Sequence, residues 1–464
     1  RTGWSAAEQF DSLRSRDQTG LMAPSVDPVQ SDDTLPARVD VVIVGGGIVG
    51  TTAALYLAKK GVTVALCEKG RIGAEQSSRN WGWCRKMKRD PREIPLAIEA
   101  LRLWGEMNEE VGGETGFRVC GIGYFFADRK TMEEHGAWLE HARLYQLDSR
   151  MLSAAEAADL IPGSTKAWAG AMLTPSDGRA EPQMAAPAIA QGARKRGAHV
   201  LTDCAVRGIE TNGGRVAGVV TEKGRIACGA VVLAGGAWSS LFAGSLGIRL
   251  PQLKVRSSVM RTAPLEGGPE MSAAAKGWGF RKRMDGGYNI AQSGESVAEI
   301  VPDMLRFARE FMPAARLKAQ KLRWRVTRRT WQEIRTPRHW ALDRPSPFEA
   351  VRTLDPEPYQ PILDEAQKNI AEAFPVFAKA RIAERWAGMI DLTPDVVPVI
   401  SPVEALPGFF IATGFSGHGF GVGPGAGRLV ADLVTGDGPV IDPAPFRFSR
   451  FTDGTKAEPY PLAL

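Results

Sequence analysis

The chain has 464 residues, 44% of them hydrophobic, which excludes global disorder and exceeds the usual size of one domain. Its net charge of +6 is local, because residues 306–344 hold twelve Lys or Arg against three acidic residues, while the rest holds 46 basic and 49 acidic residues. A nucleic-acid-binding function for the whole protein is therefore not supported.

The amino-terminal part predicts an arm followed by a βαβ unit. Residues 1–37 are polar and include a Pro/Asp/Ser-rich stretch, which is typical of an arm or linker. Residues 39–44 are apolar and β-branched, GGGIVG follows, and residues 51–60 form a good helix pattern. Gly61 ends that helix, and residues 62–67 predict a second buried strand.

Further elements alternate between the helical and the strand period. Helices are predicted at 91–111, 182–196 and 424–433, and strands at 119–127, within 198–236, within 250–291 and at 408–413. Pieces typical of a Rossmann-type domain thus occur at the start, the middle and the end of the chain. We therefore expect a second domain to be inserted between them.

The basic segment predicts a basic amphipathic helix within an insertion at 303–345. Apolar residues recur three or four positions apart at Ala308, Phe311, Ala315, Ala319, Leu322 and Val326. Basic residues fill much of the remainder. Two interpretations stay open: a helix packed on the domain with a solvated outer face, or one that docks on anionic lipid or on an acidic partner protein.

The turn after the first strand has the pattern of a dinucleotide site. Gly45 permits the tight turn, Gly47 lets the backbone approach a pyrophosphate, and Gly50 allows close packing. The amino terminus of the helix offers N–H groups to the phosphates. Glu68 ends the second strand, where its carboxylate can accept hydrogen bonds from ribose hydroxyls, and an acidic residue there argues against a 2′-phosphate.

Four segments in order, the first of which contains this turn, carry a family resemblance. They are DVVIVGGGIVG, SSRNWGW, VVLAGGAWS, and the pair RWAGMIDLTPD and GFSGHGFGVGPGAG, within residues 38–437. With them the chain resembles the D-amino-acid oxidase superfamily, in its sarcosine oxidase and bacterial D-amino-acid dehydrogenase branch. The resemblance implies FAD as the cofactor.

The resemblance also implies an α/β fold with an α+β insert. A Rossmann-type FAD-binding domain is expected at 38–118, 168–248 and 382–440, and an interleaved substrate domain on a mostly antiparallel sheet at 119–167 and 249–381. Residues 1–37 and 441–464 are then the arm and a carboxy-terminal tail.

Several segments are expected to contact FAD by this resemblance. Residues 77–80 follow the flavin, the backbone of Val206 meets the adenine, and the loop 414–421 touches the isoalloxazine ring. The full expected set is Gly45, Gly47, Ile48, Val49, Gly50, Glu68, Lys69, Ser77, Ser78, Arg79, Asn80, Trp81, Gly82, Val206, Gly235, Gly236, Trp238, Gly388, Met389, Gly414, Ser416, Gly417, His418, Gly419 and Phe420.

Covalent attachment of the flavin is not expected. Relatives that bind it through histidine carry that residue where this chain has Arg79 and Asn80. Relatives that bind it through cysteine carry that residue where this chain has Gly388.

Four residues are candidates for substrate chemistry. Arg85 is suited to bind a substrate carboxylate, and Asp391 to hold a substrate ammonium. Tyr288 is expected either to close the pocket or bind a carboxylate, or to be a cross-strand aromatic. His418 is expected beside the flavin. The resemblance places Asn289 near the position of an oxygen-activating lysine, which favours a dehydrogenase.

The predicted function is oxidation of a small amine or amino acid by hydride transfer from Cα to the flavin, giving an imine that hydrolyses. The electron acceptor is left open between oxygen, a quinone and a carrier protein. Oxidation of a 2-hydroxy acid, or a role as the flavin subunit of a larger dehydrogenase, are the alternatives.

The cysteine pattern and the hydropathy of the chain indicate where in the cell the protein is expected. The five cysteines show no CxxC pair and no metal-ligand spacing, so neither a disulfide framework nor a metal site is expected. No apolar run reaches the roughly 18 residues of a membrane span, and no secretory signal pattern is evident at the amino terminus. We expect a cytoplasmic protein, with membrane association through residues 306–344 as an open option.

Overall fold

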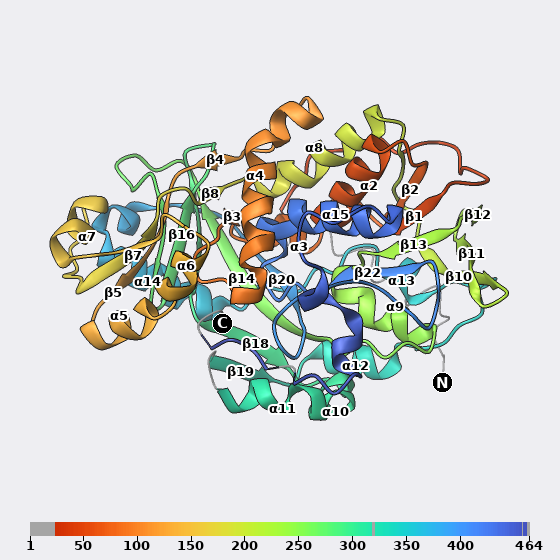
Figure 1. Ribbon diagram of the computed structural model, residues 1–464. Coiled ribbons are helices and arrows are strands. Elements are labelled where there is room, and N and C mark those ends of the chain that lie inside the picture. The colour runs from red at the N-terminus through yellow and green to blue at the C-terminus, as the bar shows by residue number, and fades with distance from the viewer. Residues whose placement is uncertain (1–23, 318–320, 457, 462–464) are drawn as a thin grey trace.

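The computed structural model describes residues 24–317, 321–456 and 458–461. Of the expected amino-terminal arm, residues 1–23 lie outside the described residues, as do residues 318–320 of the basic segment and residues 457 and 462–464 of the tail. Figure 1 shows two sheet regions side by side, joined by the long strands β14 and β20.

A six-stranded sheet carries the predicted βαβ unit. Its order is β21-β22-β13-β1-β2-β9, parallel except for β21, which runs antiparallel to β22. The strands are β1 Val41–Val44, β2 Val64–Cys67, β9 His199–Leu201, β13 Ala230–Leu233, β21 Val399–Pro402 and β22 Phe409–Thr413. These short apolar strands are buried on both faces, as parallel strands are. The predicted Rossmann-type arrangement is confirmed.

Helices cover one face of this sheet. The helix α2 (Ile48–Lys59) packs against α8 (Pro182–Lys195) and α15 (Gly419–Thr435), and α15 packs against α4 (Ile94–Val111). The last helix begins five residues earlier than its predicted start at 424, so the end of the glycine-rich loop belongs to the helix. Two small sheets complete this region: β10 Val206–Asn212, β11 Arg215–Thr221 and β12 Gly224–Ala227; and β3 Trp83–Cys84, β8 Gly178–Arg179 and β4 Arg118–Val119.

The second region is built on a ten-stranded, mostly antiparallel sheet, as predicted. Its strands are β5 Ile122–Phe126, β6 Arg150–Leu152, β7 Gly170–Thr174, β14 Leu253–Thr262, β15 Ser272–Ala275, β16 Trp278–Lys282, β17 Tyr288–Ala291, β18 Glu295–Glu299, β19 Lys321–Arg325 and β20 Ile382–Leu392. The remaining α-helices are α3 Gln76–Arg79, α5 Arg129–Gly136, α6 Leu139–Leu144, α7 Ala154–Leu160, α9 Ser239–Ser245, α10 Pro302–Arg306, α11 Ala308–Leu317, α12 Arg328–Arg335, α13 Pro347–Ala350 and α14 Gln360–Ala373.

Two strands of this sheet lie outside the expected boundaries of the substrate domain. The boundaries at 168 and 382 assign β7 and β20 to the FAD-binding domain, whereas β7 pairs with β5 and β20 pairs with β14. Because the strand period is the same in both sheets, the sequence pattern does not show which sheet a strand joins.

The predicted basic amphipathic helix, with apolar positions from Ala308 to Val326, is confirmed only in its first part, α11, and is wrong for residues 321–325, which form a strand. The segment forms α11, then β19, then α12. Residues 321–325 pair in parallel with β18, and Lys321 and Arg323 form ion pairs with Glu295 at 2.7 and 2.8 Å. Pairing with a neighbouring strand thus overrides the local helical pattern. Leu322 is compatible with either a helix or a strand.

A buried ion pair joins the two regions. Arg281 on β16 is fully buried and donates from Nη1 and Nη2 to the Glu181 carboxylate, at 2.7 and 3.0 Å, and from Nε to the carbonyl of Trp81 at 2.7 Å. Burial raises the pKa of Glu181, but the Arg281 guanidinium outweighs this and holds the pKa below its usual value.

We expect Glu181→Gln to lower the free energy of unfolding by about 3–5 kcal/mol, because it leaves a buried guanidinium without its counter-charge. Denaturant titration of the holoprotein measures this. The wild-type contribution is present above the ordinary carboxyl pKa and is lost as the pH falls through the lowered one.

The control for that variant is Glu270→Gln, which breaks an exposed ion pair with Lys282 on the same strand as Arg281. Exposed pairs contribute less than about 1 kcal/mol. Equal effects of the two substitutions would contradict the assignment of the buried pair.

Candidate functional site

A cavity of about 400 Å³ lies where the six-stranded sheet meets the larger sheet. Its walls come from the carboxyl ends of β1, β2 and β13, from α3 and β20, and from the loop that leads into α15. The crevice beyond the carboxyl ends of parallel strands is where α/β proteins bind nucleotides. Its volume falls in the range of small-molecule sites.

The glycine-rich turn places the start of α2 on the cavity wall. A Cβ on Gly50 would lie 2.0 Å from the carbonyl oxygen of Gly45, so no side chain fits there, and Gly50 itself lies behind the wall. Gly45, Gly47, Ile48 and Val49 all line the cavity. The sequence prediction of a packing role for the third glycine agrees with this geometry.

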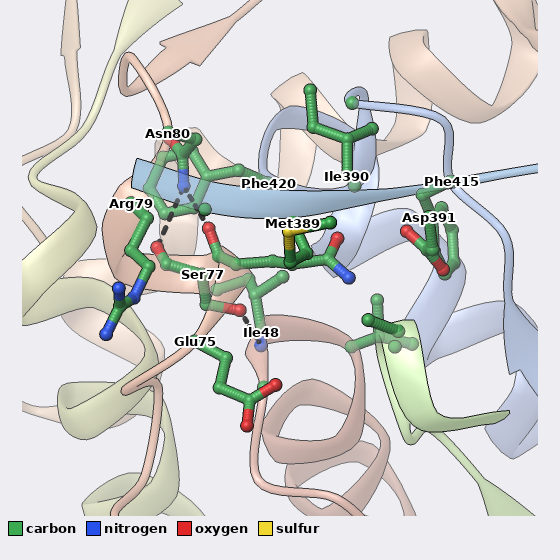
Figure 2. A pocket seen from close by; sticks show the side chains of 18 of the residues that line it. Ile48, Glu75, Ser77, Arg79, Asn80, Met389, Ile390, Asp391, Phe415 and Phe420 are labelled. Carbon is green, nitrogen blue, oxygen red and sulfur yellow. Dashed lines mark hydrogen bonds between the residues drawn. The ribbon is translucent and has the colours of Figure 1, made fainter. Parts of the chain in front are cut away.

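The short helix α3 supports the start of α2. Ser77 Oγ accepts a hydrogen bond from the Ile48 N–H at 2.8 Å, and Asn80 donates to the Ser77 carbonyl at 2.9 Å. Figure 2 shows Ser77, Arg79 and Asn80 beside Ile48. Ser78 is turned away, with its hydroxyl donating to the Glu75 carbonyl. Three of the four residues predicted in this segment therefore line the cavity.

Glu68 lies at the end of β2, as predicted. Its two carboxylate oxygens accept from the N–H groups of Gly46 and Gly70 at 2.7 and 2.8 Å. Burial raises its pKa despite the nearby Lys69. Each oxygen has a second lone pair, and both Glu68 and Lys69 line the cavity, so the carboxylate can still accept from a ribose hydroxyl.

Arg79 supplies an unsatisfied donor. Its side chain is buried and donates to the carbonyls of Ala74 and Ala387 and to Asp355, yet its Nη2 has no hydrogen-bond partner. Buried donors of this kind are rare unless a ligand meets them. Together with the start of α2 and Glu68, this orphaned donor fits a dinucleotide whose polar groups complete the wall.

The expected flavin side of the cavity is formed by β20 and the loop before α15. Gly388, Met389, Ser416, Gly417, Gly419 and Phe420 line it, as do Trp81, Val206, Gly235, Gly236 and Trp238 elsewhere on the wall. Gly414 lies outside the lining, but its N–H donates to Asp391 at 2.8 Å.

Asp391 is engaged by protein donors. Besides Gly414, its Oδ2 accepts from Gln252 at 3.0 Å and Thr413 at 3.2 Å, and burial raises its pKa to about 6. The side chain lines the cavity, and Figure 2 shows it next to Phe415. Because protein donors occupy its carboxylate, Asp391 is better suited to position the loop before α15 than to bind a substrate ammonium, which is the predicted role.

His418 immediately precedes α15, at its N-cap position, and lines the cavity. Its Nδ1 lies 3.3 Å from Oε2 of Glu93, and both side chains are buried. Burial raises the pKa of Glu93 to about 7 despite the nearby Arg89. Sequence reasoning missed Glu93, since a glutamate within an apolar helical pattern gives no signal of this pairing.

Three cations line one end of the cavity. Arg85 was predicted there, but Lys88 and Arg89 were not. Tyr124 of β5 lies between them, with the Lys88 ammonium 4.5 Å and the Arg85 guanidinium carbon 5.7 Å from its ring centroid. The run of basic residues after SSRNWGW was the available signal.

Tyr288 and Gly82 do not line the cavity, contrary to prediction. Tyr288 is fully buried, donates to the Pro269 carbonyl at 3.1 Å and packs against Phe280 and Phe377, so the cross-strand aromatic alternative is the one observed. A Cβ on Gly82 would lie 2.6 Å from both Arg281 Nε and the Ala180 carbonyl oxygen, so Gly82 makes room for the buried ion pair.

Asn289 also lies outside the cavity lining, because it points from β17 toward Arg283, whose Nη1 donates to its Oδ1 at 3.1 Å. The inference that favoured a dehydrogenase from this position therefore loses its basis.

Comparison with known proteins identifies the family. The family model described as DAO, FAD dependent oxidoreductase, matches residues 40–433. The structure of L-amino acid deaminase from Proteus myxofaciens in complex with anthranilate superposes with a TM-score of 0.89 and 35% identity, over 94% of this chain and 98% of that one. Glycine oxidase of Pseudomonas aeruginosa is 26% identical over 88% of this chain and 97% of its own length.

The chain belongs to the DAO family of FAD-dependent oxidoreductases, which confirms the resemblance inferred from its motifs, and its cofactor is FAD. Human mitochondrial sarcosine dehydrogenase is 26% identical over 90% of this chain. The chain spans only 42% of that relative's length.

We expect Glu68→Gln to weaken FAD binding about 10- to 100-fold, because charge-assisted hydrogen bonds to a ribose contribute about 1.5–3 kcal/mol. Titration of the apoprotein with FAD, followed by flavin fluorescence, measures the change. The control is Glu210→Gln, which breaks the ion pair between Glu210 on β10 and Arg225 on β12. This variant should bind FAD as the wild type does. Equal affinities of the Glu68 variant and the wild type would contradict this site.

Proposed function

We propose that the protein oxidises the C–N bond of a small amino acid or N-substituted amino acid. The observation that carries this is the cationic end of the cavity beside the loop that leads into α15, where an α-carboxylate finds Arg85. The known proteins it resembles are a glycine oxidase, a sarcosine dehydrogenase and an L-amino acid deaminase, which supports the same substrate class.

The residues of the chain supply binding and orientation. Arg85 holds the carboxylate, and the buried Oε1 of Gln292, which has no hydrogen-bond partner, accepts from the substrate nitrogen. Trp81, Trp83 and Tyr124 pack edge to face, with ring centroids 5.2 and 5.8 Å apart, and exclude water from this end.

FAD, when bound, accepts a hydride from Cα and so removes two electrons from the substrate. The substrate nitrogen gives up its proton, the resulting imine leaves, and water hydrolyses it to an oxo acid and to ammonia, or to an amine where the substrate is N-substituted. We propose that the flavin is held without a covalent bond, since Arg79, Asn80 and Gly388 occupy the positions at which relatives attach it.

We expect amino acids or N-methyl amino acids to bleach the flavin of the holoprotein under anaerobic conditions, and matched 2-hydroxy acids to bleach it at least about tenfold more slowly. The reason is that a substrate ammonium donates a charge-assisted hydrogen bond to the unpaired Gln292 Oε1, which is about twice as strong as the bond that a neutral hydroxyl donates. The flavin absorbance at saturating ligand measures this. Faster bleaching by hydroxy acids would favour the alternative of a 2-hydroxy-acid dehydrogenase, and admission of air afterwards distinguishes an oxidase from a dehydrogenase.

We also propose that the protein docks on an anionic membrane surface through α12 and β19. The inner face of α12 is polar: Arg329 pairs with Glu299 and Glu333, and Lys254 pairs with Glu333 at 2.8 Å. Its outer face exposes two large apolar side chains, Trp331 at 58% and Ile334 at 54%, among exposed polar and basic ones.

This inverted amphipathicity is unusual for a helix packed on a soluble domain. The exposed Trp324, Arg325, Arg328 and Arg335 continue the surface, which lies with α10 and α11 along one edge of the molecule (Figure 1). We call residues 324, 325, 328, 331, 334 and 335 the basic apolar surface. Tryptophan with arginine is typical of interfacial segments.

None of the helices within the described ranges is both long and apolar enough to span a bilayer. We propose that contact through the basic apolar surface is peripheral and lies at the cytoplasmic leaflet, where the reduced flavin would pass its electrons to a quinone or to a carrier protein.

We expect the holoprotein to float with vesicles that contain phosphatidylglycerol and to be released by high salt. Trp331→Ser with Ile334→Ser should weaken binding at least about tenfold, since each apolar side chain contributes about 1.5–3 kcal/mol when buried. Leu144→Ser, which removes a leucine of α6 exposed at 78%, is the matched control and should change nothing. Salt-insensitive binding, or no binding, would contradict the proposal. The basic apolar surface would then either bind an acidic partner protein or remain exposed to solvent.

A further inference from the structure

The cationic end of the cavity holds more positive charge than one carboxylate can satisfy. Lys88 and Arg89 are only 9% and 2% exposed, and Arg85 is half-buried. Within the described part of the chain, no carboxylate forms an ion pair with any of the three. The Arg89 Nη1 is buried without a hydrogen-bond partner.

The neighbouring acids do not pair directly with these cations, although Arg89 is close enough to Glu93 to oppose the rise that burial causes in the Glu93 pKa. Asp177 accepts from the N–H groups of Lys86 and Met87 at 2.8 and 3.3 Å, and Glu93 faces His418. Taking a charge out of water costs several kcal/mol unless a counter-charge meets it. Two buried cations beside a half-buried third therefore point to an anionic occupant.

The segment that carries these cations is held rigidly. Lys88 has a φ of 56°, a left-handed conformation that costs a non-glycine residue of order 1 kcal/mol or more. Trp138 donates from its indole nitrogen to the Arg89 carbonyl at 2.8 Å, and Asp177 holds the preceding turn. The cations are thus fixed in place before any ligand arrives.

We propose that the substrate carries a second carboxylate, and that Lys88 and Arg89 bind it while Arg85 holds the α-carboxylate. One guanidinium fork already matches both oxygens of one carboxylate, so the other two cations fit a second anionic group. The substrate class is then an acidic amino acid or an N-carboxymethyl amine. This inference rests on the proposed function.

Two isosteric pairs test the inference without changing the shape of the substrate: aspartate with asparagine and glutamate with glutamine, in both configurations. A third pair, iminodiacetate with N-methylglycine, removes the second carboxylate altogether. Flavin reduction in the anaerobic holoprotein should favour the acid of at least one pair about 10- to 100-fold in kcat/KM, the size of one charge-assisted hydrogen bond.

The outcomes separate the two proposals. Preference for the amide or the monocarboxylate in every pair would overturn the inference and leave the proposed function intact. Absence of flavin reduction by every amino acid, acidic or neutral, would overturn both.

Substitution of the cations locates the effect. Lys88→Met and Arg89→Met should each bring the acid-to-amide ratio toward one, while Lys88→Arg should retain most of it. Lys86→Met removes a lysine from the same turn that donates to Ser176 and lies outside the cavity lining, and it should leave the ratio unchanged. A ratio that persists in both methionine variants would overturn the inference. The flavin spectrum of each variant reports whether it is folded.

The pH dependence provides a second readout. Burial and the adjacent Arg85 lower the pKa of Lys88 to about 7. Other charged or titratable groups near it are Arg89, Tyr124 and His135, whose own pKa is lowered by burial and by Lys88. Since only the protonated amine attracts a carboxylate, the acid-to-amide ratio should fall as the pH rises through 7, and this fall should be absent in Lys88→Met. A ratio that rises with pH would contradict the role of Lys88.

Discussion

The ion pair between Arg281 and Glu181 is the interaction on which the cavity depends. It connects β16 of the large sheet to the residue that precedes α8 on the nucleotide side, and the same guanidinium holds the Trp81 carbonyl. The chain from Trp81 to Arg89 contributes the aromatic and cationic wall of the cavity. Fixing its first residue to both regions determines where that wall lies.

Close backbone contacts at glycines determine the position of the opposite wall of the cavity. Gly50 brings α2 against the Gly45 carbonyl, and a Cβ on Gly421 would lie 2.8 Å from the Trp83 carbonyl oxygen. The first contact brings the start of α2 to the cavity wall. The second brings α15 against the segment that leads to Arg85. Close backbone approach therefore places the start of α2, the start of α15 and the cationic segment around one cavity.

Charge then divides the cavity by function. The nucleotide end presents N–H groups and the Glu68 carboxylate, which suit phosphates and a ribose. The other end presents three cations and an aromatic wall, which suit a small anionic substrate. Asp391 accepts from Gly414 and Glu93 lies against His418, so these two carboxyl groups hold the loop before α15 in place.

The sequence by itself determined the features that local chemistry dictates. The turn from Gly45 to Gly50, the carboxylate of Glu68 and the order of the family motifs were readable because turn geometry and phosphate binding require those residues at that spacing. The strand periods predicted individual strands, and the family resemblance implied that they form a Rossmann-type sheet and a second, mostly antiparallel one. Tertiary structure alone decided which strands share a sheet, since β7, β19 and β20 gain their partners from distant segments. It also decided that Tyr288 faces the core and that Lys88 and Arg89 face the cavity, because the direction of a side chain depends on the packing of residues far away in the chain.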